Sequence, residues 1–263
     1  MTAAHLASEQ DDGRRPLPGA CGVIACVDGP YYMAGICDHA AWLAGRLSTT
    51  IELLHVNETR PARRGDKAAR TQVAAQDSVL ADAADRLREG GAEVVESCVS
   101  DGAFPSVVEG LAADAAAVVI GRRGSATATR ARRGVGGDVR PVLQACAAPV
   151  LVAPKVFLPI GRAVALLDRA RRDRGFADQL ATCPLLDGVT VGLARAEGGD
   201  GPVRLVPHGA PPPQLAEASA RPAAAPPCDL VVIPRVLLLE APGSPDFAVV
   251  DTLLRSRLPL LFL

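Results

Sequence analysis

The sequence predicts an α/β protein made of two tandem doubly wound parallel-sheet domains, of which the second is shortened. Short, wholly apolar runs alternate with stretches of helical periodicity, as in parallel sheets that helices cover on both faces. Several of these runs recur later in the chain in the same order. Of the 263 residues, 49% are apolar and 22% are charged, which is the composition of a globular protein with a substantial core.

Five strands and four helices are expected in the first part of the chain. The expected strands are the apolar runs at residues 22–28, 51–56, 93–99, 115–121 and 149–153. Apolar residues at helical spacing predict helices over residues 33–47, 73–87, 104–111 and 139–146. Gly90-Gly91 ends the second helix, and Pro105 suits the first turn of the third. A sheet of this kind binds ligands at the carboxyl ends of its strands.

The same pattern restarts after residue 160. Three runs match earlier ones at offsets of 140, 113 and 110, with Asp or Pro at equivalent ends. The matching pairs are 22–28 with 162–168, 118–122 with 231–235, and 149–153 with 259–263. Three matches in one order indicate a tandem duplication. The runs that begin with Pro149 and Pro259 are expected at sheet edges, paired with each other inside the chain.

The duplication divides the chain into three parts. We expect a disordered N-terminal tail at 1–19, a first domain at 20–155 and a degenerate second domain at 156–263. The second copy lacks about 30 residues relative to the first, as the offsets show. The loss falls between Leu193 and Cys228, where Pro/Ala stretches replace a helix and a strand.

Composition and motifs exclude several classes of function. The formal net charge of -1 argues against a polybasic nucleic-acid-binding protein, and no apolar run is long enough to span a membrane. The seven cysteines include no C-x-x-C pair and the four histidines form no H-x-x-x-H pair, so we expect no zinc site. The cysteines are expected to be reduced and the first 20 residues contain no hydrophobic signal segment, so we expect a cytoplasmic location. Neither Lys67 nor Lys155 stands in a Gly-Lys-Ser/Thr phosphate loop, which excludes P-loop ATPases and kinases.

A Gly/Arg-rich stretch between the fourth strand and the next helix is the part of the sequence that most strongly indicates ligand binding. Its glycines are Gly121, Gly124, Gly134, Gly136 and Gly137. Such glycines let backbone N–H groups close around an anion at a helix N-terminus. Six arginines within 19 residues suit phosphate or carboxylate, namely Arg122, Arg123, Arg130, Arg132, Arg133 and Arg140. The alternative is a flexible, solvated loop.

The remaining polar candidates are isolated. Asp28 ends the first strand and can accept from a ribose hydroxyl or hold Mg²⁺, or it can be a helix cap or turn residue; Asp168 has the same alternatives. His55, Cys26 and Cys98 lie in apolar strands and are expected in the core. No nucleophile elbow, zinc-protease helix motif or dinucleotide fingerprint occurs, so we expect no catalytic residue.

The motifs together resemble the universal stress protein family. A strand ending V-D-G is followed by I-x-L-L-H-V, V-V-I-G-x-R-G, a Gly-rich stretch and P-V-L-V-A. The resemblance covers residues 21–155 well and 160–263 weakly, and the tandem arrangement is similar to that of two-domain bacterial members. It implies a Rossmann-like stress-response protein that binds ATP, with or without Mg²⁺, rather than an enzyme; weak ATP hydrolysis is left open. It also implies domain pairing within the chain or a homodimer.

The family's nucleotide motif carries over to this sequence with one departure. By resemblance, Asp28 and Val56 lie by the adenine and ribose, and Gly121, Arg123 and Gly124 begin the phosphate loop. The third loop glycine is either Gly134, followed by Val135, or Gly136, followed by Gly137. Neither supplies the Ser or Thr hydroxyl of the family motif, a loss of about one to two decades of affinity.

Two other hypotheses stay open. The first is an interaction scaffold of the same fold that binds no nucleotide. The second is an enzyme of a related fold, an ATP pyrophosphatase or a phosphoryl-accepting receiver, but Asp28-Gly29-Pro30-Tyr31 supplies neither an S-G-G-x-D-S loop nor an acidic pair. The second repeat has Pro234-Arg235 in place of the first loop glycines, so any nucleotide is expected in the first repeat only.

Overall fold

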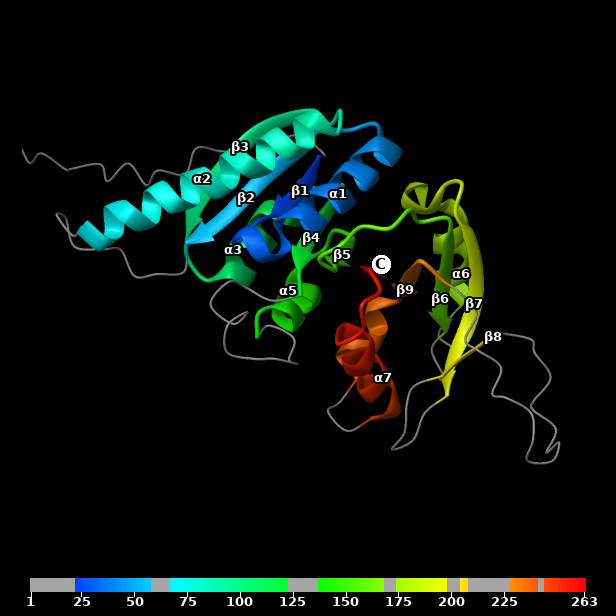
Figure 1. The fold of residues 1–263 in the computed structure, drawn as a ribbon. Coiled ribbons are helices and arrows are strands. Elements are labelled where there is room, and N and C mark those ends of the chain that lie inside the picture. The colour runs from blue at the N-terminus through cyan, green and yellow to red at the C-terminus, as the bar shows by residue number, and fades with distance from the viewer. Residues whose placement is uncertain are drawn as a thin grey trace, which may run out of the picture.

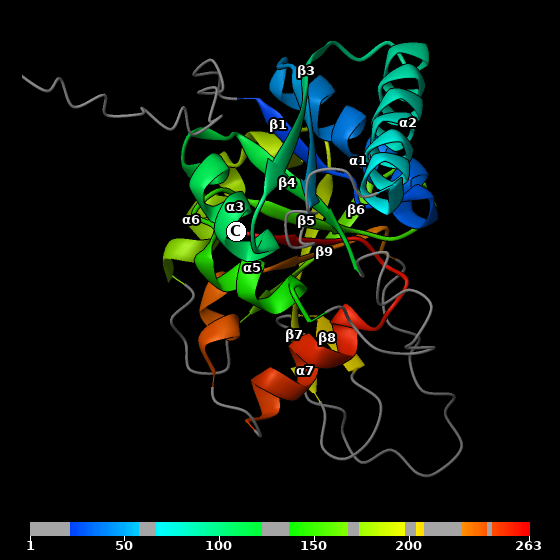
Figure 2. The same cartoon turned by 90° about the vertical axis from the view of Figure 1, so that its left-hand side faces the viewer.

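The computed structural model describes residues 22–57, 67–122, 137–167, 174–197, 204–207, 228–240 and 244–263. The α/β class is confirmed, because the strands of these residues form one sheet with helices on both faces (Figures 1 and 2). The strands are β1 Val23–Cys26, β2 Ile51–Asn57, β3 Val94–Asp101, β4 Ala117–Gly121, β5 Val150–Ala153, β6 Arg162–Leu167, β7 Thr190–Glu197, β8 Arg204–Pro207, β9 Leu230–Ile233 and β10 Leu260–Phe262.

The helices fill the connections between these strands. The α-helices are α1 Pro30–Leu47, α2 Lys67–Glu89, α3 Phe104–Leu111, α5 Val139–Ala145, α6 Arg174–Thr182 and α7 Pro245–Leu254. Short 3-10 turns are η1 Ala112–Asp114, η2 Pro184–Leu186 and η3 Arg235–Leu239. Helix α2 begins six residues before the expected Val73, and η1 occupies the three residues between the expected third helix and the expected fourth strand.

The strand order divides the sheet into two similar halves. It reads β3-β2-β1-β4-β5-β10-β9-β6-β7-β8, so the first half (β1 to β5) and the second half (β6 to β10) meet at the β5–β10 pair. Figure 1 shows the halves side by side, the first in blue to green and the second in green-yellow to red. β1 lies between β2 and β4 as β6 lies between β7 and β9, and all of these neighbours are parallel.

The seam between the halves is the antiparallel pair β5–β10. Leu261 lies opposite Leu151, and both strands follow a proline. The carbonyl oxygens of Pro149 and Pro259 accept equivalent bonds, from Val118 N at 2.8 Å and Val231 N at 3.1 Å. Each proline therefore begins its strand without an N–H of its own and still extends the ladder through its carbonyl.

The second half differs from the sequence prediction at its outer edge. We expected both a helix and a strand to be missing after Leu193, but β8 is present and pairs with β7 in the antiparallel direction. Only six residues, 198–203, separate the two strands. A parallel crossover needs a dozen or more residues, so this connection permits only an antiparallel return.

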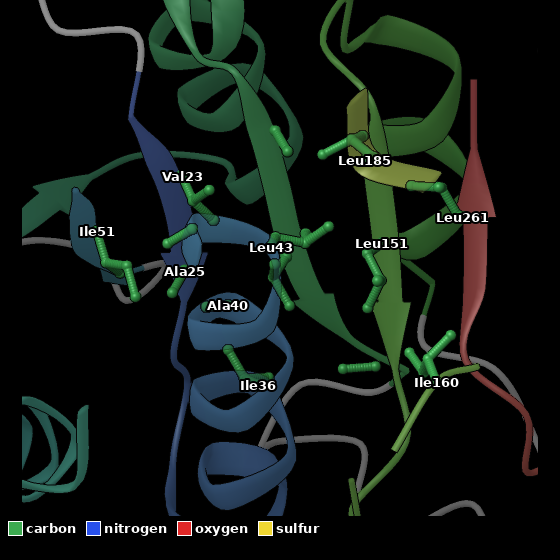
Figure 3. Close-up of a cluster of buried hydrophobic side chains, with 14 of the residues drawn as sticks. Val23, Ala25, Ile36, Ala40, Leu43, Ile51, Leu151, Ile160, Leu185 and Leu261 are labelled. Carbon is green, nitrogen blue, oxygen red and sulfur yellow. The ribbon is translucent and has the colours of Figure 1, made fainter. Parts of the chain in front are cut away.

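Two apolar clusters cover the two faces of the sheet. One contains side chains of α1, α2, α6 and η2, and the other contains side chains of α3, α5, η3 and α7. Alternation along each strand divides its residues between the clusters, so that Ala25 of β1 belongs to the first and Cys26 to the second. Figure 3 shows Leu43, Leu151, Leu185 and Leu261 around the seam, so both halves contribute to one continuous core.

Candidate functional site

The carboxyl ends of β1, β2 and β4 form the candidate site. After β1 the chain passes through α1 to β2 on one side, whereas β4 lies on the other side, which makes this edge the switch point of the first half. Ligands of open α/β sheets bind at such points. Helix α1 starts here with Pro30 at its first position, and its N-cap residue is Gly29, which has no side chain to cap the helix. Its first N–H groups and its dipole therefore favour an anion nearby.

The structure brings several of the predicted site residues to this edge. Asp28 is exposed just beyond β1, Val56 is 7% exposed near the end of β2, and Gly121 ends β4. Gly137 is exposed two residues before α5, with open space around the position of a Cβ. The other predicted site residues lie outside the described part of the chain, namely Arg123, Gly124, Gly134 and Gly136.

Gly121 has a packing role that the sequence did not reveal. A Cβ at this position would lie 3.2 Å from both Cβ and Cγ of Tyr32, in the first turn of α1. A glycine therefore permits the close approach of α1 to the end of β4. One feature of the sequence could have indicated this packing. Tyr31-Tyr32 stands directly after Asp28-Gly29-Pro30, and aromatic residues make up only 3% of the chain.

Arg122 corrects the prediction that all six arginines of the Gly/Arg-rich stretch serve an anion. Its side chain is only 6% exposed and donates to backbone carbonyls of the second half. Nη1 donates to Leu254 O at 2.6 Å and to Leu253 O at 3.3 Å, and Nη2 donates to Leu258 O. Burial lowers the pKa of Arg122 to about 10, partly offset by Tyr32. The guanidinium is thus still charged at neutral pH; carbonyl oxygens accept from both Nη groups, and Nε is buried without a hydrogen-bond partner among the described residues.

Arg140 also faces the second half. Its guanidinium carbon lies 4.1 Å from the centre of the Phe247 ring on α7. Both Nη atoms are buried without a hydrogen-bond partner in the described part of the chain. A cation over an aromatic face is stabilised by the ring quadrupole. The other arginines of the stretch, Arg123, Arg130, Arg132 and Arg133, lie outside the described residues.

The isolated candidates have structural roles where they are described. His55 is 5% exposed, and its Nδ1 lies 2.8 Å from Val27 O, so the prediction of a core histidine is confirmed. Cys26 is also in the core, where burial raises the pKa of its thiol and disfavours the reactive thiolate. Asp168 and the side chain of Cys98 lie outside the described residues.

His39 is a buried polar residue that the sequence analysis missed. It is fully buried in α1, Nδ1 donates to Gly35 O at 2.6 Å, and the ring meets Phe157 edge to face. Burial is the largest cause that lowers the pKa of His39, and the charge of Arg122 lowers it further, against the raising effects of Gly35 O and Asp38. A lone His within an apolar helix gives no signal of these contacts.

The described residues contain no cluster of three or more His, Cys, Asp or Glu side chains that could hold a metal ion. Within the same residues, no helix is both long and apolar enough to cross a membrane.

The strand order and the helices on both faces define a doubly wound α/β protein. Residues 23–154, half of the chain, match the universal stress protein family. The chain belongs to this family.

Individual known proteins are similar to this chain in sequence or in fold. Universal stress protein Slr1230 of Synechocystis is 24% identical over 189 residues, which cover 62% of this chain and 66% of that protein. The match thus spans just under two-thirds of the length of this curated relative. A solved universal stress protein from Archaeoglobus fulgidus has a TM-score of 0.56 and 11% identity, over 92% of this chain and 98% of that one. The functionally unknown protein PA1789 of Pseudomonas aeruginosa has a TM-score of 0.52 and 13% identity, with 93% and 92% covered.

Proposed function

We propose that the chain is a stress-response protein that binds one adenine nucleotide, ATP with or without Mg²⁺, at the switch point of its first half and does not turn it over. Family membership supports the stress-response role. In this proposal residues 20–155 and 156–263 are tandem domains, preceded by a tail at 1–19. The equivalent strand orders on the two sides of the β5–β10 pair support the duplication.

The observation that carries the nucleotide proposal is the meeting of three features at one edge. Asp28 is an exposed carboxylate after β1, α1 begins directly after it with a glycine as its N-cap residue, and Gly121 ends the neighbouring β4. A carboxylate can accept from ribose hydroxyls or hold Mg²⁺, and N–H groups at a helix start attract phosphate. The Gly/Arg-rich stretch begins at this same edge.

The second half supports a single site for each chain. There β9 is followed directly by Pro234 and η3, whose Leu237 and Leu238 are buried in the core. Gln144 of α5 donates to Leu238 O at 3.2 Å, which ties this turn to the first half. Because Pro234 and η3 pack into the core, no glycine loop follows β9. In this proposal the second half therefore has a structural role and binds no nucleotide.

A scaffold that binds no nucleotide is the second candidate, and the close contact of Tyr32 with Gly121 favours it. The phenol ring takes up space directly beside the glycine that would begin a phosphate loop. The departure of the loop from the family's Ser or Thr also favours this candidate. Under this hypothesis the carboxyl edge of the first half contacts another protein instead.

Isothermal titration of the full chain with ATP and Mg²⁺ at low salt tests the proposal. We expect one site per chain, abolished by Gly124→Val because the side chain would occupy the space of the anion. Nucleotide released on denaturation of the purified protein would support the same conclusion. Two sites per chain, a site that survives Gly124→Val, or no heat in the parent protein at low salt would refute it.

A further inference from the structure

The outer part of the second half has an open groove on the face of the sheet that α6 covers. The groove has a volume of about 540 Å³ and is lined mainly by apolar side chains of α6, η2 and β7. Leu186 and Val189 belong to the core beneath it, whereas Val191 and Leu193 of β7 are only partly buried. Apolar side chains that are gathered in one groove and still partly exposed are typical of a surface that binds another molecule.

The first half has the same strand positions fully covered. The facing residues of β1 and β2 recur in β6 and β7 at the offset of 140 on both strands, so β2 and β7 are equivalent. Ile51 and Leu53 of β2 thus correspond to Val191 and Leu193 of β7. Ile51 and Leu53 are 0% exposed. Helix α2 accounts for the difference, because in the first half it packs on β2, β3 and α1 (Figure 1).

No helix of the described residues takes the place of α2 in the second half. α6 and η2 follow β6 as α1 follows β1, and η3 and α7 lie on the opposite face of the sheet. Only six residues separate β7 from β8, whereas α2 alone has 23. The groove is therefore the surface that a helix placed like α2 would cover.

Helix α2 shows which side chains suit such a surface. Four of its apolar side chains are buried at the i, i+3, i+4, i+7 spacing of one helix face, namely Leu80, Ala83, Ala84 and Leu87. Arg86, at i+6, donates to both carboxylate oxygens of Asp38 on α1, from Nε at 2.9 Å and from Nη2 at 2.8 Å. Apolar packing and one bidentate ion pair thus join α2 to the first half.

The second half has the equivalent carboxylate beside the groove. Asp178 of α6 corresponds to Asp38 at the offset of 140, and Leu180 is buried as Ala40 is. Ala177, next to Asp178, lines the groove. Asp178 is exposed, and within the described part of the chain it forms no ion pair. The groove therefore combines an apolar wall with an acidic group that is available to a cation.

We propose that this groove binds an amphipathic α-helix of a partner protein, in the position that α2 has in the first half. The partner helix presents Ala and Leu side chains at i, i+3, i+4 and i+7 to Val191 and Leu193, and its arginine at i+6 pairs with Asp178. Bidentate pairing of arginine with a carboxylate is directional, so this contact fixes the register of the helix. The groove lies apart from the carboxyl edge of the first half, so this binding does not depend on nucleotide.

A fluorescent peptide with the sequence of α2 is the probe, and fluorescence anisotropy measures its binding to the full chain. Asp178→Asn in the protein and Arg86→Gln in the peptide should each raise the dissociation constant about three- to tenfold. Together they should raise it no further, because both remove the same ion pair. Asp38→Asn is the matched control, because it changes the equivalent carboxylate of the first half, and it should leave the affinity within about twofold of the parent value.

A second pair of variants tests the apolar wall. Leu193→Arg brings a charge into the groove and should weaken binding more than about tenfold, because the helix would bury that charge. Leu239→Arg is its control, since Leu239 is 75% exposed on η3, on the opposite face, and the variant should bind the peptide as the parent does. Circular dichroism checks that both variants keep the fold.

Three results would overturn the proposal. The first is no binding of the peptide by the parent protein, and the second is equal affinity of the parent and Asp178→Asn proteins. The third is a dimer of the parent protein that Leu193→Arg dissociates, because the groove would then bind a second copy of this chain. Loss of binding in Asp178→Asn and Leu193→Arg, with binding kept in Asp38→Asn and Leu239→Arg, would support it.

Discussion

Gly35→Ala is expected to destabilise the protein although it replaces a helical glycine by the best helix former. Gly35 lies within α1, where the chain that leaves β5 crosses the helix. A Cβ at Gly35 would lie 1.9 Å from Pro154 O and 2.8 Å from both C and O of Lys155. Ordinary contacts of a Cβ begin at 3.4 Å, and the opposing atoms belong to the backbone rather than to a flexible side chain.

The change in the free energy of unfolding that Gly35→Ala causes can be estimated from three contributions. Overpacking against a fixed backbone costs about 3 kcal/mol. The bond from His39 Nδ1 to Gly35 O is strained by the same displacement, at about 1 kcal/mol. Replacing Gly by Ala in a helix returns about 1 kcal/mol. The net loss is about 3 kcal/mol, which corresponds to a fall in Tm of about 6–12 °C.

Gly45→Ala is the matched control, because Gly45 is exposed in the same helix and a Cβ there would meet nothing within 4 Å. It should raise the free energy of unfolding by about 0.5–1 kcal/mol. Urea unfolding followed by circular dichroism measures both variants. If Gly35→Ala were as stable as Gly45→Ala, the close packing of the 154–155 segment on α1 would be wrong.

Three further predictions concern the seam, the site and pH. Deletion of residues 259–263 removes β10 and exposes the edges of β5 and β9, so light scattering should detect aggregation; a monodisperse variant with the parent Tm would contradict this. Gly137→Ser should tighten ATP binding roughly tenfold or more if Gly136 is the third loop glycine, and Val135→Ser if Gly134 is, in titrations where affinity falls with added salt. His39 has its pKa lowered by burial, so the unfolded chain binds more protons and stability should decrease as pH falls below 6.5. His39→Leu should reduce this loss of Tm, and an unchanged pH profile would exclude His39 as its source.

The location of the candidate site residues was predictable only where their signal is local. Asp28 and Gly121 could be placed at one edge because they follow or end apolar strands that are parallel neighbours, whereas Val56 was named through the family resemblance alone. Arg122 was misassigned because its neighbours in sequence are glycines and arginines, whereas its partners are 131 to 136 residues away. Tyr32 and His39 were missed because nothing in the sequence near them identifies the atoms that they contact.

The sequence by itself was enough to predict the alternation of strands and helices and the pairing of the two proline-led strands. These features follow from periodicity and from residues at strand ends, which are properties of short segments. Only the tertiary structure decided that β8 returns antiparallel, that Gly35 and Gly121 are needed for close approach, and that Arg122 bonds to α7. The reason is physical: the free energy of a buried donor or of a missing Cβ depends on which atoms lie opposite, and the folded chain brings those atoms from distant parts of the sequence.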